Sequence, residues 1–406
     1  MPGHSRVRTA LAAGLVAVML VAVSGSDSAD DGLALPRVPW DGGPAYYAAY
    51  PRAAASGWTD PGRFPLGVWF ESVHSDADVA RDKAIGINTY VELTADTDIG
   101  AVRRGGMSAV VSEQYAGMGD ETVGRLLGDE VDMTHGPENG YAEMQRLADR
   151  FPADDGRIRY ANFGKGVMFW QTDADAGRFV NEYTSVVSND VYWYTDPHQC
   201  GPGDLPMGVT PETCRRSANY GLTMDRMRYL DALDGKRQPI YAFVEVGHPF
   251  TESDAPTITG PQIAGAVLNS LIHEARGIIY FNHNFGGQCL SYHVLRESCG
   301  DAVRPAVAQT NARITRLAPV LNTQSYAWTF NPELDTMLKA YGGSWYVFAM
   351  PGRKAGTGTQ KLTLPPGRTG STAEVLFEHR VVPIRAGVIE DAFAEESTYH
   401  IYRITP

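Results

Sequence analysis

Eight short apolar runs recur between residues 65 and 285, and helix-like segments separate many of them. Most of these runs are continuously apolar and do not alternate with polar residues, which is typical of parallel strands buried on both faces. The runs are PLGVWFES (65–72), GINTYVEL (86–93), MSAVVSEQ (107–114), TVGRLLGDE (122–130), RIRYANFG (157–164), VVSNDVYWY (186–194), PIYAFVEVG (239–247) and GIIYFNHNF (277–285). Eight repeats favour a closed (β/α)8 TIM barrel. An open dinucleotide-binding sheet is disfavoured, because no GxGxxG motif follows the first run.

Three of the intervening segments carry clear helix signals. DADVARDKAIG (76–86) ends in a glycine, and NGYAEMQRLADRFP (139–152) has apolar residues at helical spacing before a terminal proline. PQIAGAVLNSLIHEARG (261–277) is the longest. These segments are the expected outer helices of the barrel.

The pattern changes beyond about Leu317. Short β-like pieces such as WYVFAMPG (345–352) and AEVLFEHR (373–380) are separated by Gly and Pro turns, and no long helical period remains. We therefore expect an α/β barrel over residues 64–316 and a small antiparallel β-sandwich over residues 317–406. A Pro/Gly-rich lead segment, residues 30–63, precedes the barrel.

The N-terminus has the order of a secretory signal. Arg6 and Arg8 precede an apolar run over residues 10–23, and a small polar stretch, SGSDSADD, follows it. The apolar run is too short to span a bilayer comfortably. We expect residues 1–29 to be a signal peptide and the protein to be secreted. An uncleaved signal would instead hold the protein at the cell surface.

The four cysteines fall into two local pairs, each flanking a short loop. An even count of closely spaced cysteines in an exported chain predicts disulfides, here Cys200 with Cys214 and Cys289 with Cys299. A zinc site is disfavoured because no CxxC spacing occurs.

Charge and motifs exclude several other functions. The net charge of −12 argues against a nucleic-acid partner, since nucleic-acid recognition needs a basic surface. The sequence contains neither an HExxH motif, which would indicate a metal site, nor a GxSxG motif, which would indicate a serine hydrolase. We expect a monomer that has no membrane span after signal removal and uses no cofactor.

Ionisable residues stand where several of the predicted strands end. The fourth run closes with Asp129 and Glu130, and the seventh closes with Glu245. In a TIM barrel the reactive groups lie at the carboxyl ends of the strands, and strands four and seven lie on roughly opposite sides. Two carboxyl groups facing each other across the barrel suit the cleavage of a glycosidic bond. A separation of about 5 to 5.5 Å implies retention of configuration through a covalent intermediate.

Other roles for these acids remain open. A glutamate after a strand can cap the next helix or pair with an arginine. Asp129 could orient Glu130 or bind a sugar hydroxyl, and Asp190 could bind substrate, order its loop, or act with Glu130 as the base of an inverting enzyme. The barrel could also bind carbohydrate without catalysis.

Aromatic and polar residues near the strand ends complete the expected site. Sugar rings present apolar faces that stack on aromatic side chains, while their hydroxyls need polar partners. The sequence offers two groups of candidates: Trp69, Tyr192 and Trp193 for stacking, and His248, Asn282 and His283 for hydrogen bonding.

The order of several motifs adds a family resemblance. FPLGVWFES, AIGINTYVEL, LLGDEVDM, RYANFGKGV, YAFVEVGHP and IHEARGIIYFNHNF, over Phe64 to Phe285, resemble secreted bacterial TIM-barrel proteins that are described as glycoside hydrolases similar to the clan A enzymes. The resemblance implies that Glu130, after strand four, is the acid/base, and that Glu245, after strand seven, is the nucleophile. The C-terminal β-domain is similar to the accessory sandwich that many such enzymes carry.

Overall fold

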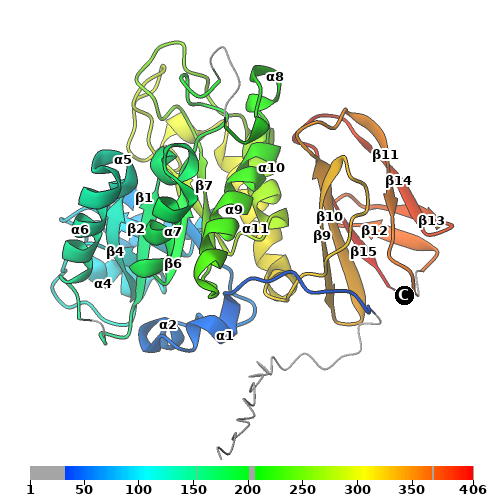
Figure 1. Ribbon diagram of the computed structural model, residues 1–406. Helices are drawn as coiled ribbons and strands as arrows, with labels where there is room; N and C mark the ends of the chain where they lie inside the picture. The colour runs from blue at the N-terminus through cyan, green and yellow to red at the C-terminus, as the bar shows by residue number, and fades with distance from the viewer. Residues whose placement is uncertain (1–32, 153, 201–205, 368–369, 406) are drawn as a thin grey trace, which may run out of the picture. The chain divides into compact units, whose positions relative to one another are not determined.

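The computed structural model describes residues 33–152, 154–200, 206–367 and 370–405. Eight parallel strands form a closed barrel in chain order, so the predicted TIM-barrel fold is confirmed (Figure 1). The barrel strands are β1 (Leu66–Glu71), β2 (Thr89–Leu93), β3 (Ser108–Val111), β4 (Thr122–Asp129), β5 (Ile158–Phe163), β6 (Val186–Asn189), β7 (Ile240–Glu245) and β8 (Gly277–Phe281). The predicted signal peptide lies outside the described residues.

Helices surround these strands. They are α1 (Gly43–Tyr47), α2 (Pro51–Ala55), α3 (Asp76–Ala84), α4 (Ile99–Arg104), α5 (Val131–Thr134), α6 (Gly136–Ala148), α7 (Asp173–Glu182), α8 (Pro211–Cys214), α9 (Ala218–Asp231), α10 (Gly260–Ile272) and α11 (Arg304–Leu321). Short π and 3-10 turns are η1 (Gly166–Trp170), η2 (Pro206–Gly208), η3 (Ala232–Asp234) and η4 (Ser298–Gly300). Within the part of the chain that the structure describes, no helix is both long and apolar enough to cross a membrane.

The elements depart from the sequence expectation at three places. No helix connects β3 and β4, because the connecting segment SEQYAGMGDE has two glycines and no helical period. Strand β6 ends at Asn189, so Tyr192 and Trp193 belong to the following loop. Helix α10 ends at Ile272, before Glu274, which has a left-handed backbone with φ 73°.

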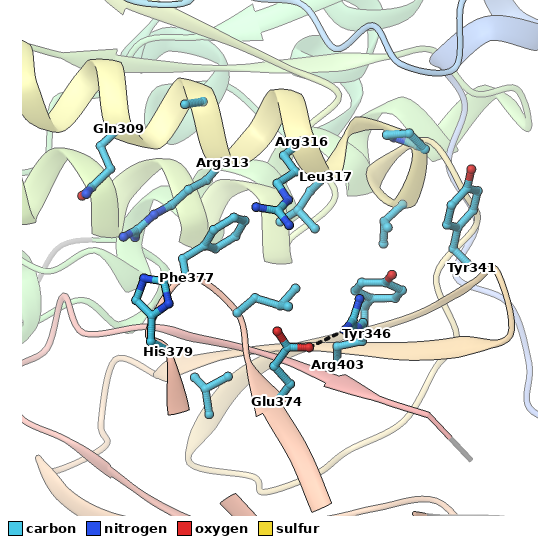
Figure 2. A pocket seen from close by; sticks show the side chains of 15 residues that line it. Gln309, Arg313, Arg316, Leu317, Tyr341, Tyr346, Glu374, Phe377, His379 and Arg403 are labelled. Atoms are coloured by element: carbon cyan, nitrogen blue, oxygen red, sulfur yellow. Dashed lines mark ion pairs between the residues drawn. The ribbon is translucent and has the colours of Figure 1, made fainter. Parts of the chain in front are cut away.

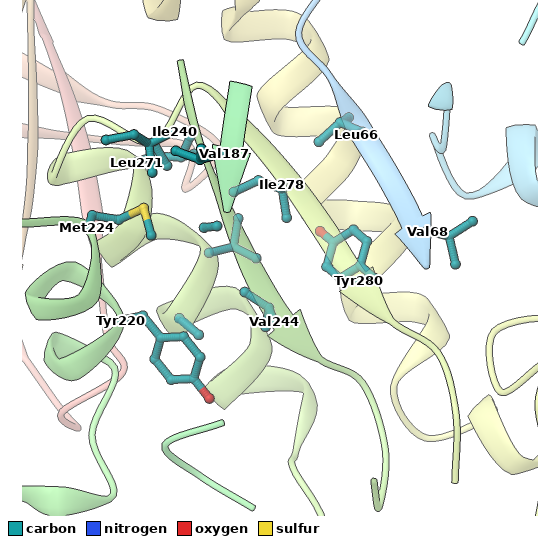
Figure 3. Close-up of a cluster of buried hydrophobic side chains, with 14 of the residues drawn as sticks. Leu66, Val68, Val187, Tyr220, Met224, Ile240, Val244, Leu271, Ile278 and Tyr280 are labelled. Carbon is teal, nitrogen blue, oxygen red and sulfur yellow. The ribbon is translucent and has the colours of Figure 1, made fainter. Parts of the chain in front are cut away.

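Alternating side chains of each strand enter two separate cores. Phe243 on β7 and Trp69 on β1 point into the barrel, and their rings lie 5.3 Å apart. The intervening residues point outward and pack on the helices. Figure 3 shows this outer layer, with Val187, Ile240 and Ile278 on the strands near Met224 of α9 and Leu271 of α10.

The lead segment closes the amino end of the barrel. Helices α1 and α2 lie below the strands (Figure 1), and Tyr47 and Trp58 join the inner core. The Tyr47 hydroxyl hydrogen-bonds to that of Tyr241 at 2.5 Å. With that end covered, a ligand of the barrel has to approach from the carboxyl end of the strands.

An antiparallel sheet of seven strands follows the barrel, as the sequence predicts. Its order is β11-β14-β13-β12-β15-β10-β9. The strands are β9 (Leu334–Tyr341), β10 (Ser344–Pro351), β11 (Gly358–Thr363), β12 (Thr372–Val375), β13 (Arg380–Arg385), β14 (Val388–Phe393) and β15 (His400–Ile404). Strand β13 pairs with β12 through its first residues and with β14 through Ile384 and Arg385, so the sheet curls at this strand around its own core.

The sheet packs on the barrel beside α10 and α11 (Figure 1). Four apolar side chains of the sheet belong to the same core as the outer layer of the barrel: Met337, Phe348, Met350 and Ile401. The two predicted disulfides are also present, with Cα–Cα distances of 5.7 Å for Cys200–Cys214 and 5.6 Å for Cys289–Cys299.

Candidate active site

Three strands end in strained residues at the carboxyl end of the barrel. Phe70, Glu92 and Glu130 follow or close β1, β2 and β4 with φ values of 51°, 60° and 50°. A left-handed backbone is unfavourable for any residue other than glycine and is concentrated at functional sites. The strain at Glu130 turns the chain from β4 directly into α5.

Glu130 belongs to a cluster of acids at this end. Burial and the negative charges of Asp129 and Asp132 together raise the pKa of Glu130 to about 7, although Lys165 and an interaction with Asp190 lower it in part. Burial also raises the pKa of Asp190 well above its usual range, with Glu130 as the strongest charged neighbour. The pKa of each of these two carboxyl groups therefore depends on the charge of the other.

Asp190 has few other partners. Its Oδ2 accepts a hydrogen bond of 3.4 Å from the Tyr192 hydroxyl. Its Oδ1 is buried and meets no N–H or O–H donor among the described residues. A buried carboxyl oxygen without a donor is unfavourable unless a proton occupies the space beside it.

Asp129 is fixed by a chain of hydrogen bonds that runs into the barrel. Asn162 Nδ2 donates to Asp129 Oδ1 at 2.9 Å, and Ser188 Oγ donates to Asn162 Oδ1 at 2.6 Å. The hydroxyl of Tyr160 bonds to Ser188 in turn. These residues come from β4, β5 and β6, so this series of hydrogen bonds fixes the position of Asp129 relative to the neighbouring strands.

Glu245 is fully enclosed. Its exposed fraction is 0%. Thr195 Oγ1 donates to Oε1 at 3.1 Å, and the Tyr220 hydroxyl of α9 donates to Oε2 at 2.7 Å. Burial raises the pKa of Glu245 to about 7, although these hydrogen bonds lower it in part. In this structure neither carboxyl oxygen has a free approach from solvent.

The Tyr192 hydroxyl is buried beside the acid cluster and donates to Asp190. Burial raises the pKa of this phenol well above its usual value, and the negative charges of Asp190, Glu130 and Asp129 add to the rise, as does Glu245 to a smaller extent. Its ring contacts Phe281 of β8 at 5.2 Å. Tyr192 therefore contacts the acid cluster and is also influenced by the charge of Glu245.

Two of the predicted stacking residues are buried. Trp193 is 0% exposed; its Nε1 donates to Thr223 Oγ1 at 2.9 Å and its ring packs on Phe169. Trp193 therefore has no free face for a sugar, because its loop turns it toward the helices. Trp69 is also buried, in the inner core of the barrel.

The three predicted polar candidates mainly hold loops together. The Asn284 side chain accepts the backbone N–H of His248 at 2.6 Å, and the His248 ring bonds to Thr257 at 2.9 Å. Asn282 donates to the buried Glu71. Burial lowers the pKa of His283 to about 4, so its ring is neutral at neutral pH.

Exposed aromatic rings surround His283 at the mouth. Phe70, Phe285 and Tyr292 are 42%, 40% and 63% exposed, and their rings lie 5.4 to 6.0 Å from the His283 ring. We call Phe70, His283, Phe285 and Tyr292 the aromatic rim. Tyr292 could not be found from strand ends, because it belongs to the loop closed by the Cys289–Cys299 disulfide.

Sequence reasoning also missed the supporting residues. Asp132 is buried and accepts the backbone N–H groups of Gly164 and Val167 at 3.1 and 2.7 Å. Lys165 pairs with Asp196 beside the cluster. Asn162 and Ser188 could have been recognised from the sequence as site-supporting residues, because both are polar residues inside apolar strands. Among the described residues, no group of three or more His, Cys, Asp or Glu side chains is placed to hold a metal ion.

Comparison with solved structures shows the fold. One similar structure is described as a glycoside hydrolase; it is 11% identical with a TM-score of 0.55, over 84% of this chain and 92% of that one. Another is a glycoside hydrolase family 5 protein from Bacteroides vulgatus, 11% identical with a TM-score of 0.51, over 84% of this chain and 89% of that one. No protein-family model and no curated protein matches the sequence.

Proposed function

We propose that this protein hydrolyses O-glycosidic bonds of a polysaccharide or cell-envelope glycan, with Glu130 as the general acid. The supporting observation is the acid cluster at the open end of the barrel, where the pKa of Glu130 is about 7. A carboxyl group that still holds its proton at neutral pH can protonate the leaving oxygen of a glycoside. The fold shared with the two glycoside hydrolases agrees with this chemistry but does not specify it.

We assign Glu245 the role of nucleophile in a retaining mechanism. Glu130 directly follows β4 and Glu245 closes β7, so both glutamates stand at the carboxyl end of the barrel. Hydrogen bonds from Thr195 and Tyr220 stabilise the carboxylate form and fix its orientation. Attack on an anomeric carbon needs contact with a free oxygen, so the Thr195 segment has to move when a glycan binds.

Asp190 fits a positioning role better than the role of an inverting base. The two carboxyl groups of an inverting enzyme are separated by about 6.5 to 9.5 Å, which leaves room for a water molecule. Asp190 is instead the acid whose strongest charged neighbour is Glu130, and its buried Oδ1 meets no donor in the described part of the chain. Its unpartnered Oδ1 can accept the Glu130 proton and hold the acid in place.

The aromatic rim supplies the sugar-binding surface in this proposal. Phe70, Phe285 and Tyr292 offer exposed ring faces at the mouth, while the exposed Asp129 offers a polar contact to hydroxyl groups. The N-terminal signal sequence and the two disulfides support action outside the cytosol. A glycan of the envelope or the surroundings is then the substrate, and a monomer without a cofactor is sufficient.

The test is a panel of polysaccharides with detection of released reducing sugar, followed by separate Glu130→Gln and Glu245→Gln variants on a responsive glycan. Loss of a general acid lowers kcat by about 10² to 10⁴-fold. Glu138→Gln, at an exposed position of α6, is the matched control and should leave the rate unchanged. Full turnover in Glu130→Gln would contradict its assignment, and full turnover in Glu245→Gln would contradict that of the nucleophile. NMR of the first-formed anomer separates retention from inversion.

The enclosure of Glu245 favours a second candidate, carbohydrate binding without catalysis. Both of its oxygens are already hydrogen-bonded inside the protein, as in a structural carboxyl group. In that case a glycan in the gel slows the migration of the wild-type protein in affinity electrophoresis, but the protein releases no sugar from that glycan. Phe285→Ala should then reduce the retardation. Release of sugar that depends on Glu130 excludes this candidate.

A further inference from the structure

A second cavity of about 640 Å³ lies between the later part of α11 and the C-terminal sheet (Figure 2). Figure 2 shows Arg313 and Arg316 reaching from α11 toward Phe377 and His379 on the turn between β12 and β13. The strands β9 and β10 add Tyr341 and Tyr346, and Arg403 on β15 faces Glu374 on β12. We call this cavity the flank cleft.

The flank cleft is separate from the acid cluster. Helix α11 follows the last strand of the barrel, so its first residues are closest to the carboxyl ends of the strands. The cleft uses residues from Gln309 to Val320, along the outer side of the barrel. A ligand bound there would not contact Glu130.

Two arginines in the flank cleft have no acidic partner. Arg313 and Arg316 are one helical turn apart, and both lie over the Phe377 ring, at 5.4 and 5.7 Å from its centroid. Arg313 bonds to the Tyr399 hydroxyl, which is neutral. Among the described residues no carboxylate forms an ion pair with either guanidinium, whereas Glu374 is already paired with Arg403 at 2.5 Å.

This local charge contrasts with the rest of the molecule. The chain carries a net charge of −12, and surface arginines on other helices of the barrel have acidic partners. Arg178 on α7 pairs with Glu182 at 2.8 Å, although it too lies over an aromatic ring, that of Tyr141 at 4.0 Å. Two adjacent cations without counter-charges repel each other, so an anion from outside would relieve an unfavourable interaction.

The walls of the cleft fit a ring-shaped ligand that also bears hydroxyl groups. Phe377 and His379 have left-handed backbones, with φ 67° and 53°, and this strained turn places the Phe377 ring against α11. Tyr346 is half-buried and Tyr341 is exposed, so each can present an apolar ring and a hydroxyl. The volume is within the range of small-molecule sites, about 300 to 1,000 Å³.

We propose that the flank cleft binds an acidic saccharide, with the sugar carboxylate between Arg313 and Arg316 and the sugar ring against the aromatic walls. A guanidinium presents parallel N–H donors that match a carboxylate, and two of them from adjacent turns can hold both oxygens. Such a site would keep a charged polymer near the protein and raise its effective concentration at the mouth. The proposal stands whether or not the barrel is catalytic.

The test uses the full chain and isothermal titration with trigalacturonic acid, with its fully methyl-esterified form as the uncharged counterpart. We expect the acid to bind at least about tenfold more tightly than the ester, because charge-assisted hydrogen bonds contribute this much. Arg313→Gln and Arg316→Gln should each weaken binding of the acid about tenfold. Arg178, which also lies over an aromatic ring, provides the matched control: Arg178→Gln should change the affinity for trigalacturonic acid less than about twofold. Glu130→Gln should also change this affinity less than about twofold. Thermal melts establish that each variant is folded.

Several results would overturn the proposal. Equal affinity for the acid and the ester would show that charge does not contribute to binding. Unchanged binding in both arginine variants would show that the ligand does not bind in the flank cleft. Weakening by Glu130→Gln alone would place the ligand at the barrel mouth. Sodium sulfate that competes as strongly as the trisaccharide would reduce the cleft to a simple anion site. No binding at about 1 mM ligand would exclude even a weak site, since millimolar affinity is detectable at that concentration.

Discussion

Burial raises the pKa of both Glu130 and Glu245 to about 7, but the two carboxyl groups have different neighbours. Glu130 is surrounded by other acids, which favour its protonated form. Glu245 receives hydrogen bonds from two hydroxyl groups, which favour its ionised form. A similar pKa therefore arises from opposite electrostatic surroundings, and these suit a proton donor and a nucleophile respectively.

The Asp129→Asn variant tests the electrostatic control of Glu130. Asp129 is the neighbour whose charge raises the pKa of Glu130 most, so its removal should lower that pKa, by about one unit at most. A general acid works only while protonated, so kcat/KM should fall as the pH rises through about 7 in the wild type and at a lower pH in the variant. Asp149→Asn, outside the cluster, should leave the profile unchanged. Carboxyl ¹³C NMR gives the same pKa without a substrate, and an unshifted value in Asp129→Asn would contradict the argument.

Glu245 also makes the stability of the protein depend on pH. The pKa of a glutamate is about 4.5 when unfolded and that of Glu245 is about 7 when folded, so the folded state binds the proton more tightly. The free energy of unfolding should therefore decrease as the pH rises from about 4.5 to about 7, by about 3 kcal/mol for this group. Urea unfolding at a series of pH values measures the slope, and Glu245→Gln should flatten it. Glu143→Gln on the surface of α6 should keep the wild-type slope; a Glu245→Gln slope equal to it would refute the prediction.

An ion-pair network connects β1, α3 and the loop after β8 at the mouth of the barrel. Arg296, in the loop after β8, pairs with Glu71 at the end of β1 at 3.0 Å and with Asp82 of α3 at 2.6 Å. His293 also bonds to Glu71, at 2.6 Å. All three main partners are buried, so this network fixes the loop that carries the aromatic rim.

Arg296→Met should therefore be strongly destabilising. It leaves two buried carboxylates without their main counter-charge, which typically costs about 3 to 5 kcal/mol. Arg81→Met on α3 removes an exposed pair with Asp78 and should cost less than about 1 kcal/mol. Denaturant unfolding at pH 7 compares the two. Equal destabilisation by both changes would show that the network contributes no more than a surface ion pair.

The sequence predicted the strands better than the contacts at their ends. Continuous apolar runs are a local signal, so all eight strands and the position of Glu130 after β4 could be read directly. The partners of Glu245 could not, because Thr195 and Tyr220 come from a loop and a helix whose packing is set only by the closed barrel. The burial of Trp193 could not be predicted for the same reason: an aromatic residue after a strand can turn toward the ligand or toward the helices, and periodicity does not distinguish the two.

At the scale of the whole molecule, the C-terminal sheet is connected to the mouth of the barrel. Glu396, in the loop between β14 and β15, accepts hydrogen bonds from the Tyr194 hydroxyl at 2.6 Å and from the Ser217 backbone at 2.8 Å. Tyr194 precedes Thr195, which covers Glu245, and Ser217 precedes α9, which carries Tyr220. The sheet thus supports both segments that enclose the second glutamate.

This connection and the shared apolar core predict that barrel and sheet unfold together. Met337, Phe348, Met350 and Ile401 of the sheet would be exposed if the sheet separated first, and each buried side chain of this size contributes about 1.5 to 3 kcal/mol. Calorimetry should show one transition whose calorimetric and van't Hoff enthalpies agree. Glu396→Ala should lower its midpoint without splitting it, since the apolar contacts remain, whereas Glu390→Ala on the exposed side of β14 should have little effect. Two resolved transitions in the wild type would show that the contact between barrel and sheet is too weak to couple their unfolding. Such a result would also contradict the idea that the sheet supports the Thr195 segment.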